Sequence, residues 1–249
     1  MITFRDVQEF CEEASRVRSQ AMLQDTLQDI SQRMGFRYFA LTHHIDLRAA
    51  PSSGVRIANY PQRWIEFFDE QRLFAVDPIH RASHSTSLGF AWSDVSALIN
   101  LTPRDHTVLS KAREAGIGDG FTIPANVPGE ANGSCSFAME DGATIYVEQF
   151  PLVQLVGNFA FESARRLMRP QARSISPTPR LTERQLECVA LVARGKTDWE
   201  ISRILGVSHE TVIQHLKDAR ERYGVSNRTM LTVRALFDGS ITFTDILAK

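Results

Sequence analysis

The sequence has few of the features that mark exported, membrane-spanning or disulfide-bonded proteins. Among its 249 residues are only three cysteines, Cys11, Cys135 and Cys188, which lie far apart and include no Cys-x-x-Cys pair. Because the cysteines are few and odd in number, they argue against a disulfide framework and a zinc site. We expect all three to pack as small apolar side chains. No apolar run approaches the roughly 20 residues that span a bilayer, and the first residues lack the regions of a signal peptide. The sequence therefore predicts a cytoplasmic protein without a membrane partner.

The chain also has little net charge, −1, but its two ends differ. From Gln171 onward it holds 12 Lys and Arg against 9 Asp and Glu, whereas the preceding residues hold 16 against 20. A basic excess at one end is typical of nucleic-acid binding. Because this excess is modest, we expect tight DNA binding to need a dimer, which doubles the phosphate contacts.

Residues 196–205 have the pattern of a short amphipathic helix. Thr197 and Glu200 show the Thr-x-x-Glu spacing of a capping box, in which each side chain bonds the backbone N–H of the other residue. Gly206 ends the helix, since glycine enters the left-handed conformation without a Cβ penalty. The expected buried face consists of Trp199, Ile201, Ile204 and Leu205.

A second helix is predicted from His209 to Tyr223, with Ser208 as its cap. Its apolar face follows a spacing of four, three and four residues: Val212, Leu216, Ala219 and Tyr223. Two helices joined by a tight glycine-containing turn indicate a helix-turn-helix, whose second helix lies in the DNA major groove. On spacing alone, a solvated helix in an ordinary bundle remains the alternative.

Several short segments extend this pattern along the last seventy or so residues. They are Leu181-Thr182-Glu183-Arg184-Gln185, Gly195-Lys196-Thr197, Trp199-Glu200-Ile201, Gly206-Val207-Ser208, Thr211-Val212, His215 and Asn227-Arg228. Together they resemble the C-terminal domain of the LuxR family of transcription factors. The chain departs from the family at Gln185, where Glu is usual, and this exchange affects a local ion pair rather than the fold.

The resemblance implies which residues meet DNA. We expect Thr211, Gln214, His215 and Lys217 near bases and Ile213 against a thymine methyl group, with phosphates held by Lys196, Ser208 and Arg220. The complete predicted set is Lys196, Thr197, Ser208, His209, Thr211, Ile213, Gln214, His215, Lys217 and Arg220.

Residues 60–92 form the most aromatic part of the chain. Tyr60, Trp64 and Phe68 are four residues apart and share one helix face, which on periodicity alone favours an ordinary core. Asp77 fits that interpretation poorly, because a carboxylate amid apolar sequence must be exposed, cap a helix or meet a specific donor. A cap on a helix beginning near Pro78 is the simple explanation.

The spacing of these residues is also that of a known domain. The motif Tyr-Pro-x-x-Trp ends at Trp64 and is followed by Asp77-Pro78 thirteen residues after Trp64 and by Trp92 twenty-eight residues after Trp64. This spacing resembles that of the autoinducer-binding domain of quorum-sensing LuxR proteins. The resemblance covers roughly residues 5–165 and implies an N-acyl-homoserine lactone as ligand. The predicted ligand-binding residues are Tyr60, Trp64, Phe68, Asp77, Trp92, Thr122 and Ser136.

Their chemistry suits such a ligand. Asp77 can accept the amide N–H, the Trp64 indole can donate to the lactone carbonyl, and Tyr60 can donate to the amide carbonyl, with Ser136 or Thr122 assisting. Trp92 and Phe68 supply flat apolar walls. A few placed polar groups in an apolar pocket are typical of small-ligand recognition.

Two histidine pairs invite a metal-site hypothesis, which we do not favour. His43 and His44 are adjacent in a predicted strand, so they point to opposite faces and cannot chelate one ion; we expect them at the surface or a sheet edge. His80 and His84 are four residues apart, but no third ligand is evident.

The predicted fold class is α+β. The N-terminal domain is expected to be an α/β/α sandwich around an antiparallel sheet, followed by a small all-α helix-turn-helix domain. Expected helices cover residues 3–20, 21–34, 101–115, 150–168, 183–194 and 227–237, and expected strands cover 36–45, 55–58, 121–123, 134–139 and 143–146. The domain bounds are 1–169 for ligand binding, 170–180 for a proline-containing linker and 181–249 for DNA binding.

The sequence thus predicts a quorum-sensing transcriptional regulator that needs no cofactor besides its effector, an N-acyl-homoserine lactone. The resemblance implies a homodimer on a palindromic site of double-stranded DNA, with RNA polymerase as a further partner. One alternative is a LuxR-like regulator that answers a different small molecule or none. The other is an enzyme such as a lactone hydrolase, which the absence of a Gly-x-Ser-x-Gly elbow and of a His-rich metal motif disfavours.

Overall fold

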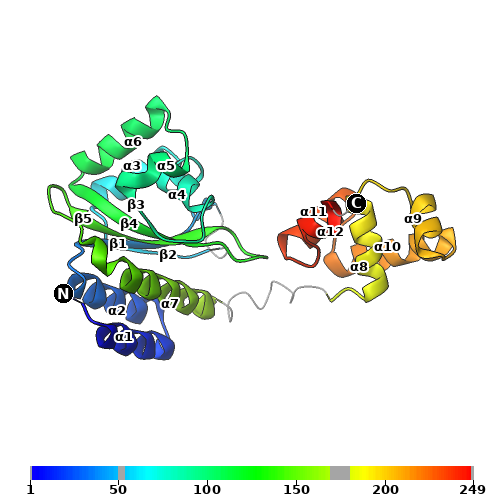
Figure 1. Ribbon diagram of the computed structural model, residues 1–249, viewed down its shortest axis with the longest axis horizontal. Helices are drawn as coiled ribbons and strands as arrows, with labels where there is room; N and C mark the ends of the chain where they lie inside the picture. Colours follow the sequence, from blue (N-terminus) through cyan, green and yellow to red (C-terminus); the bar gives the residue numbers. More distant parts are fainter. Residues whose placement is uncertain (1, 50–53, 169–179, 248–249) are drawn as a thin grey trace. The chain divides into compact units, whose positions relative to one another are not determined.

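The structure, a computed structural model, describes residues 2–49, 54–168 and 180–247. The chain divides into two compact units, residues 1–127 with 131–174 and residues 128–130 with 175–249 (Figure 1). The predicted linker, residues 170–180, lies outside the described residues except for Arg180. Within the described ranges no helix is long and apolar enough to cross a membrane.

The N-terminal unit contains a sheet of five short strands and helices on both of its faces. Its strands are β1 (Tyr38–His43), β2 (Arg56–Ala58), β3 (Phe90–Ala91), β4 (Ile117–Ala125) and β5 (Gly133–Glu140). Its helices are α1 (Phe4–Arg16), α2 (Gln20–Arg33), α3 (Gln62–Glu70), α4 (Pro78–Ser83), α5 (Val95–Leu98), α6 (Pro103–Glu114) and α7 (Phe150–Met168), with short 3-10 turns η2 (Leu73–Ala75), η3 (Trp92–Asp94) and η4 (Val147–Gln149).

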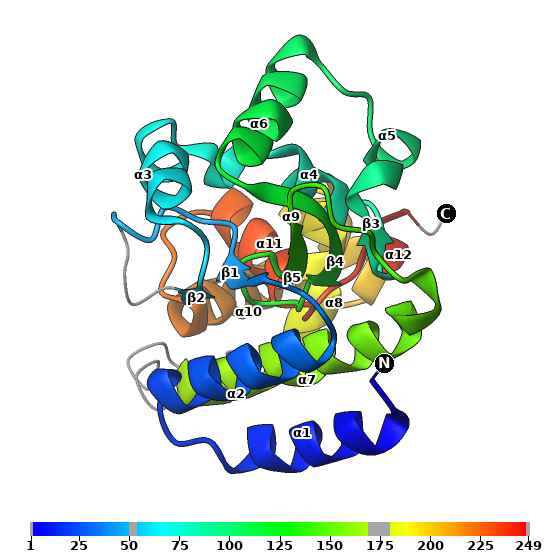
Figure 2. The ribbon, with the colours of Figure 1, turned by 90° about the vertical axis from the view of Figure 1, so that its left-hand side faces the viewer.

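The five strands are antiparallel and lie in the order β2-β1-β5-β4-β3. Helices α2 and α7 cover one face, with α1 packed beneath them, and α3 to α6 cover the other (Figure 2). The predicted α/β/α sandwich around an antiparallel sheet is therefore confirmed. The expected strand at 143–146 was wrong: β5 already has β1 and β4 on its two sides, and Tyr146 is 59% exposed.

Successive strand residues point to opposite faces, and in this sheet the two faces differ in side-chain size. Toward α1, α2 and α7 the strands present large residues, among them Phe39, Leu41, Phe121, Ile123 and Phe137, which form the main core. Toward α3 to α6 they present short side chains: Ala40, Thr42, Gly120, Thr122, Ser134, Ser136 and Ala138. The chain therefore fills the first face by itself and leaves space on the second.

Both N-terminal helices form where expected, but neither buries its whole apolar side. Thr3 and Asp6 make a capping box at the start of α1. Phe4 and Met22 are apolar but 66% and 47% exposed, because each lies in the first turn of its helix, before the packed stretch begins.

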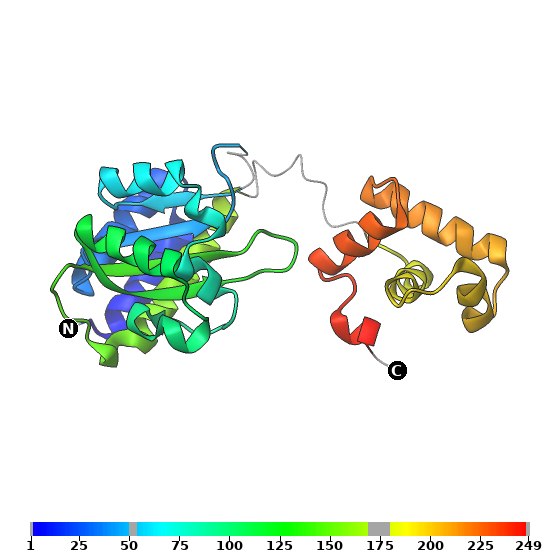
Figure 3. The ribbon, with the colours of Figure 1, turned by 90° about the horizontal axis from the view of Figure 1, so that it is seen from above.

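Among the described residues, the C-terminal unit has five helices around a core of its own. They are α8 (Glu183–Ala193), α9 (Asp198–Leu205), α10 (His209–Tyr223), α11 (Arg228–Phe237) and α12 (Phe243–Leu247). Figure 3 shows α10 as the long orange helix. The predicted inward face of α10 is confirmed, since Val212, Leu216, Ala219 and Tyr223 are all buried.

The turn between α9 and α10 follows the sequence signals closely. Thr197 and Glu200 form the capping box, Gly206 ends α9 in the left-handed conformation with φ of 66°, and Ser208 caps α10. The expected buried face of α9 was partly wrong, because Trp199 is 63% and Ile204 is 54% exposed. The buried side centres on Ile201, and a residue two positions away lies about 200° around the helix, so Trp199 cannot share it.

Candidate functional site

A cavity lies between the sheet and the helices α3, α4 and α6, on the face with short side chains. It encloses about 490 Å³, its open mouth included. Its walls are Ala40, Thr42, Tyr60, Trp64, Phe68, Asp77, Ile79, His80, Trp92, Val108, Leu109, Ala112, Ile117 and Ser136. Six of the seven predicted ligand-binding residues are among them, and Thr122 is not.

Asp77 both caps α4 and faces the cavity. Its Oδ1 atom accepts the backbone N–H groups of Ile79 at 2.8 Å and His80 at 3.0 Å. The predicted helix cap is therefore present, and it uses only one carboxylate oxygen. The other oxygen, Oδ2, makes no hydrogen bond within the described residues and is not fully enclosed, so it is open to a donor in the cavity.

Tyr60 and Trp64 bring two further polar atoms to the same cavity. The Tyr60 hydroxyl and the Trp64 indole N–H have no hydrogen-bond partner among the described residues, and neither atom is sealed off. Burial raises the pKa of Tyr60, and the neighbouring Asp77 and Cys135 add to the effect, so the phenol keeps its proton and remains a donor. One acceptor and two donors thus line an otherwise largely apolar space.

Thr122 acts on the site through Trp92 rather than as part of the wall. The Trp92 indole N–H donates to Thr122 Oγ1 at 2.8 Å, and that hydroxyl is 2.8 Å from Ser136 Oγ. Gly120 allows this arrangement, because a Cβ atom there would come within 2.6 Å of the Trp92 ring. The side chain of Thr122 is fully buried and therefore positions Trp92 as a wall of the cavity.

His44 meets two histidines that lie some forty residues further along the chain, His80 and His84, and His80 lines the cavity. His44 stacks on His80 with ring centroids 3.7 Å apart, and its Nδ1 atom is 2.9 Å from Nε2 of His84. The other nitrogen of His44 is 2.9 Å from Ser134 Oγ. Among the described residues no group of three or more His, Cys, Asp or Glu side chains is arranged to hold a metal ion.

The prediction that His43 and His44 lie at the surface or a sheet edge was therefore wrong, although the two rings do point to opposite faces. His43 is 3% exposed, packs against Phe161 with ring centroids 5.1 Å apart, and accepts the N–H of Val55. Burial, reinforced by the neighbouring His80, His84 and His43 rings, holds the pKa of His44 well below its usual range. Burial and His80 also lower the pKa of His84.

These pKa shifts predict that the N-terminal unit loses stability as the pH falls through about 6.5. The unfolded chain protonates His44 near its ordinary pKa of about 6.5, whereas the folded chain keeps it neutral, so unfolding takes up a proton. The contribution of His44 to stability is full above that pH and decreases below it by up to about 1.4 kcal/mol per pH unit. Melting curves between about pH 7.5 and 5.5 measure the effect. A His44→Gln variant should flatten the curve, and an unchanged slope would contradict the assignment.

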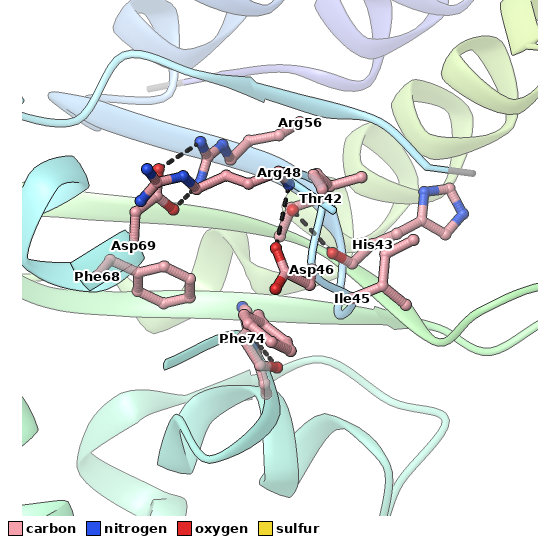
Figure 4. Close-up of a pocket in the computed structure, with 11 residues that line it drawn as sticks. Thr42, His43, Ile45, Asp46, Arg48, Arg56, Phe68, Asp69 and Phe74 are labelled. Atoms are coloured by element: carbon pink, nitrogen blue, oxygen red, sulfur yellow. Dashed lines mark hydrogen bonds and ion pairs between the residues drawn. The ribbon is translucent and has the colours of Figure 1, made fainter. Parts of the chain in front are cut away.

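A second hollow adjoins the cavity, and Thr42, Phe68 and His80 line both. Its polar groups are paired with one another: Arg56 donates to both carboxylate oxygens of Asp69, at 2.6 and 2.9 Å, beside Phe68 and Phe74 (Figure 4).

The outward face of α10 carries most of the predicted DNA-binding residues. Thr197, Ser208, His209, Ile213, Gln214 and Lys217 are exposed, and Lys196, Thr211, His215 and Arg220 are half-buried. Lys217 lies 4.0 Å from Glu221 and Lys196 lies 3.9 Å from Glu200. Because exposed pairs of this kind contribute little, a phosphate can replace either acidic partner.

Comparison with known proteins decides the family. The model of the family described as "Autoinducer binding domain" matches residues 19–164, and that described as "Bacterial regulatory proteins, luxR family" matches residues 179–235. The chain belongs to the LuxR family. The HTH-type quorum sensing-dependent transcriptional regulator RpaR of Rhodopseudomonas palustris is 30% identical over 94% of this chain and 93% of its own. The transcriptional activator LuxR of Aliivibrio fischeri is 26% identical over 90% of each chain.

Solved structures agree on the fold of this LuxR-family chain. Escherichia coli SdiA is similar with a TM-score of 0.67, at 22% identity over 95% of this chain and 98% of that one. A structure titled "SdiA in complex with octanoyl-rac-glycerol" gives a TM-score of 0.68 at the same identity. The predicted family and fold class are confirmed: the chain is a LuxR-family transcriptional regulator with an autoinducer-binding domain and a DNA-binding helix-turn-helix, and not an enzyme.

Sequence reasoning missed Thr42 of β1 and His80 of α4 as walls of the LuxR-type cavity. It also missed that His44 stacks on His80 and contacts Ser134 of β5. The alternation of β1 could have placed Thr42 on the face of Ala40, but no local signal joins His44 to residues some forty positions away.

Proposed function

We propose that this LuxR-family regulator binds an N-acyl-homoserine lactone in the cavity and then, as a homodimer, a palindromic DNA site. Asp77 Oδ2 accepts the ligand amide N–H, while Tyr60 donates to the amide carbonyl and Trp64 to the lactone carbonyl. The observation that carries this assignment is the presence of one open acceptor and two open donors on a single largely apolar cavity. Phe68, Trp92 and Ser136 complete the walls, with Thr122 holding Trp92.

The DNA-binding part of the proposal rests on the outward face of α10. We assign base contacts to Thr211, Gln214, His215 and Lys217 and a thymine-methyl contact to Ile213, since these residues follow Ser208, the cap of the second helix. We assign phosphate contacts to Lys196, Ser208 and Arg220, and we place Thr197 and His209 in the same DNA-binding set. We place ligand binding in residues 1–169 and DNA binding in 181–249, joined by 170–180, and the protein in the cytoplasm with RNA polymerase as a further partner.

For the homodimer we assign part of the contact to α11. Val233 is 51% exposed and Leu236 is half-buried, so both can reach a second copy. Ala235, on the same helix, is fully buried and is left out.

Thermal melting with a ligand panel tests the proposal. A ligand that binds only the folded state stabilises it by about 2.7 kcal/mol at a hundredfold excess over its dissociation constant. We expect such a rise with at least one class of homoserine lactone, tested with short, long, branched and aromatic acyl groups. Octanoyl-glycerol, the compound named with the SdiA structure, is the matched comparison because it is acylated but has no amide N–H. A rise with the glycerol ester and none with any lactone would favour a regulator of a different small molecule.

Selection of bound sequences from random duplex DNA, with and without the stabilising lactone, tests the proposal that a homodimer binds a palindromic DNA site. A dimer predicts recovered sequences with two inverted half-sites whose centres lie one helical turn, or a multiple of it, apart. Recovery of single half-sites would contradict the dimeric mode. Incubation with the lactone should return it unopened, and a ring-opened product would contradict the receptor assignment.

A further inference from the structure

The outward face of α10 carries three acidic side chains, although a carboxylate facing phosphates weakens DNA binding. They are Glu210, Asp218 and Glu221. Glu221 lies 4.0 Å from a cation, Lys217. Hydrogen bonds from its own backbone and from Ser208 lower the pKa of Glu210, which lies at the start of the helix, where the dipole favours a negative charge. Asp218 lies in the middle of the helix and has neither form of compensation.

The partner of Asp218 is the amide of Gln214. The Gln214 Nε2 atom donates to Asp218 Oδ1 at 2.5 Å, and within the described residues Asp218 forms no ion pair and no other hydrogen bond. Gln214 lies about 200° around the helix from the buried Val212, so it points away from the core. Asp218 follows one turn later on the same side. The two side chains therefore form one polar unit on the face assigned to DNA.

This polar unit offers mainly acceptors to a base pair. Because one N–H of Gln214 is used, its amide keeps Oε1 and a second N–H, while the carboxylate of Asp218 only accepts. In the major groove adenine presents an amino donor beside the N7 acceptor, which matches an amide, and cytosine presents only an amino donor, which matches a carboxylate. Guanine and thymine present a carbonyl oxygen, which would face the carboxylate as a second acceptor.

We propose that Asp218 is a further specificity-determining residue of the DNA-binding unit, which accepts the amino group of a cytosine and positions Gln214 to bind an adenine. The inference rests on the proposed placement of α10 in the major groove. One helical turn is about 6 Å and base pairs are about 3.4 Å apart, so the two bases lie about two positions from each other. The same carboxylate repels phosphates and so lowers the affinity for all DNA sequences.

Binding constants at one fixed salt concentration test the proposal. The duplexes are the site recovered by selection, its single base-pair replacements and an unrelated duplex. In the wild type we expect a cytosine position at which each replacement weakens binding about tenfold, within the usual cost of a mismatched base pair. An adenine position about two base pairs away should behave in the same way.

Two variants connect these preferences to Asp218. Asp218→Asn keeps an oxygen for the Gln214 amide and puts an N–H₂ donor in place of the other oxygen. It should prefer guanine or thymine where the wild type prefers cytosine, and keep the adenine preference. Asp218→Ala removes both oxygens, so it should lose the cytosine preference, weaken the adenine preference and bind the unrelated duplex at least as tightly as the wild type.

Glu221→Gln is the control for charge, since it removes an acid from the same face of α10 in the last turn, further from the cap. It should leave the cytosine preference unchanged. Base preferences that are the same in Asp218→Asn, Asp218→Ala and the wild type would overturn the inference alone, because the contact with Gln214 would then only stabilise the helix. Recovery of no preferred sequence by the wild type would contradict the proposed function and this inference with it.

Discussion

Replacement of Asp77 by Asn should remove most of the lactone-induced rise in melting temperature and leave the ligand-free protein almost unchanged. Asn and Asp are equally good helix caps, so the side-chain oxygen of Asn can still accept the N–H groups of Ile79 and His80. The amide nitrogen then takes the place of Oδ2 and meets the ligand N–H as a second donor. Loss of a hydrogen bond to a charged acceptor costs about 1.5–3 kcal/mol, so the dissociation constant should rise roughly 10- to 150-fold.

Asp77→Ala is the control for the cap. It removes the cap and the acceptor together, so the ligand-free protein should also lose stability, by about 1 kcal/mol. Comparison of the two variants separates the role of the Asp77 carboxylate as helix cap from its role as acceptor for the ligand amide. Should Asp77→Asn respond to lactone as the wild type does, the carboxylate does not hold the amide, and the orientation of the ligand must be revised.

Ile201→Ala is expected to unfold the helix-turn-helix unit at temperatures where the wild type is folded. Ile201 is fully buried in the core of that unit, and truncation of a buried Ile to Ala costs about 2–5 kcal/mol. A small domain has little stability to spare, so its transition should fall by roughly 10–30 °C, and DNA binding should fall with it. The N-terminal unit has a core of its own and should keep its lactone response.

Ile204→Ala is the matched control, since it makes the same chemical change on the same helix at a side chain that is 54% exposed. Its stability should stay within about 0.5 kcal/mol of the wild type. Calorimetry that resolves the two transitions measures both variants. Equal losses in the two would contradict the burial pattern of α9 described above.

The helix-turn-helix was predictable almost residue by residue because its signals are local. The Thr197–Glu200 capping box, Gly206 and Ser208 each act within four residues, and the structure has all of them. Local rules failed where side-chain type and helix phase disagreed. Trp199 is strongly apolar, yet its angle around α9 turns it to solvent.

The walls of the cavity were predictable in membership more than in detail. The spacing of Tyr60, Trp64 and Asp77 brought them to one cavity as expected. The sequence could not show that one carboxylate oxygen of Asp77 caps α4 while the other faces the cavity, because this depends on which oxygen accepts the backbone N–H groups. The histidine cluster was missed for a related reason: strand alternation separates His43 from His44 but does not reveal which distant residues either one meets.

The unequal faces of the sheet also bear on how receptors of this kind diversify. Strand pairing depends on backbone hydrogen bonds, and the large residues opposite the cavity hold the sheet to α1, α2 and α7 whatever lies on the other side. Ala40, Thr42 and Ser136 line the cavity, so they can change with less cost to folding than the large residues on the other face. One face of these strands determines which ligand fits, and the other face stabilises the fold. Ligand selectivity can therefore change during evolution by single substitutions of short side chains while the protein still folds.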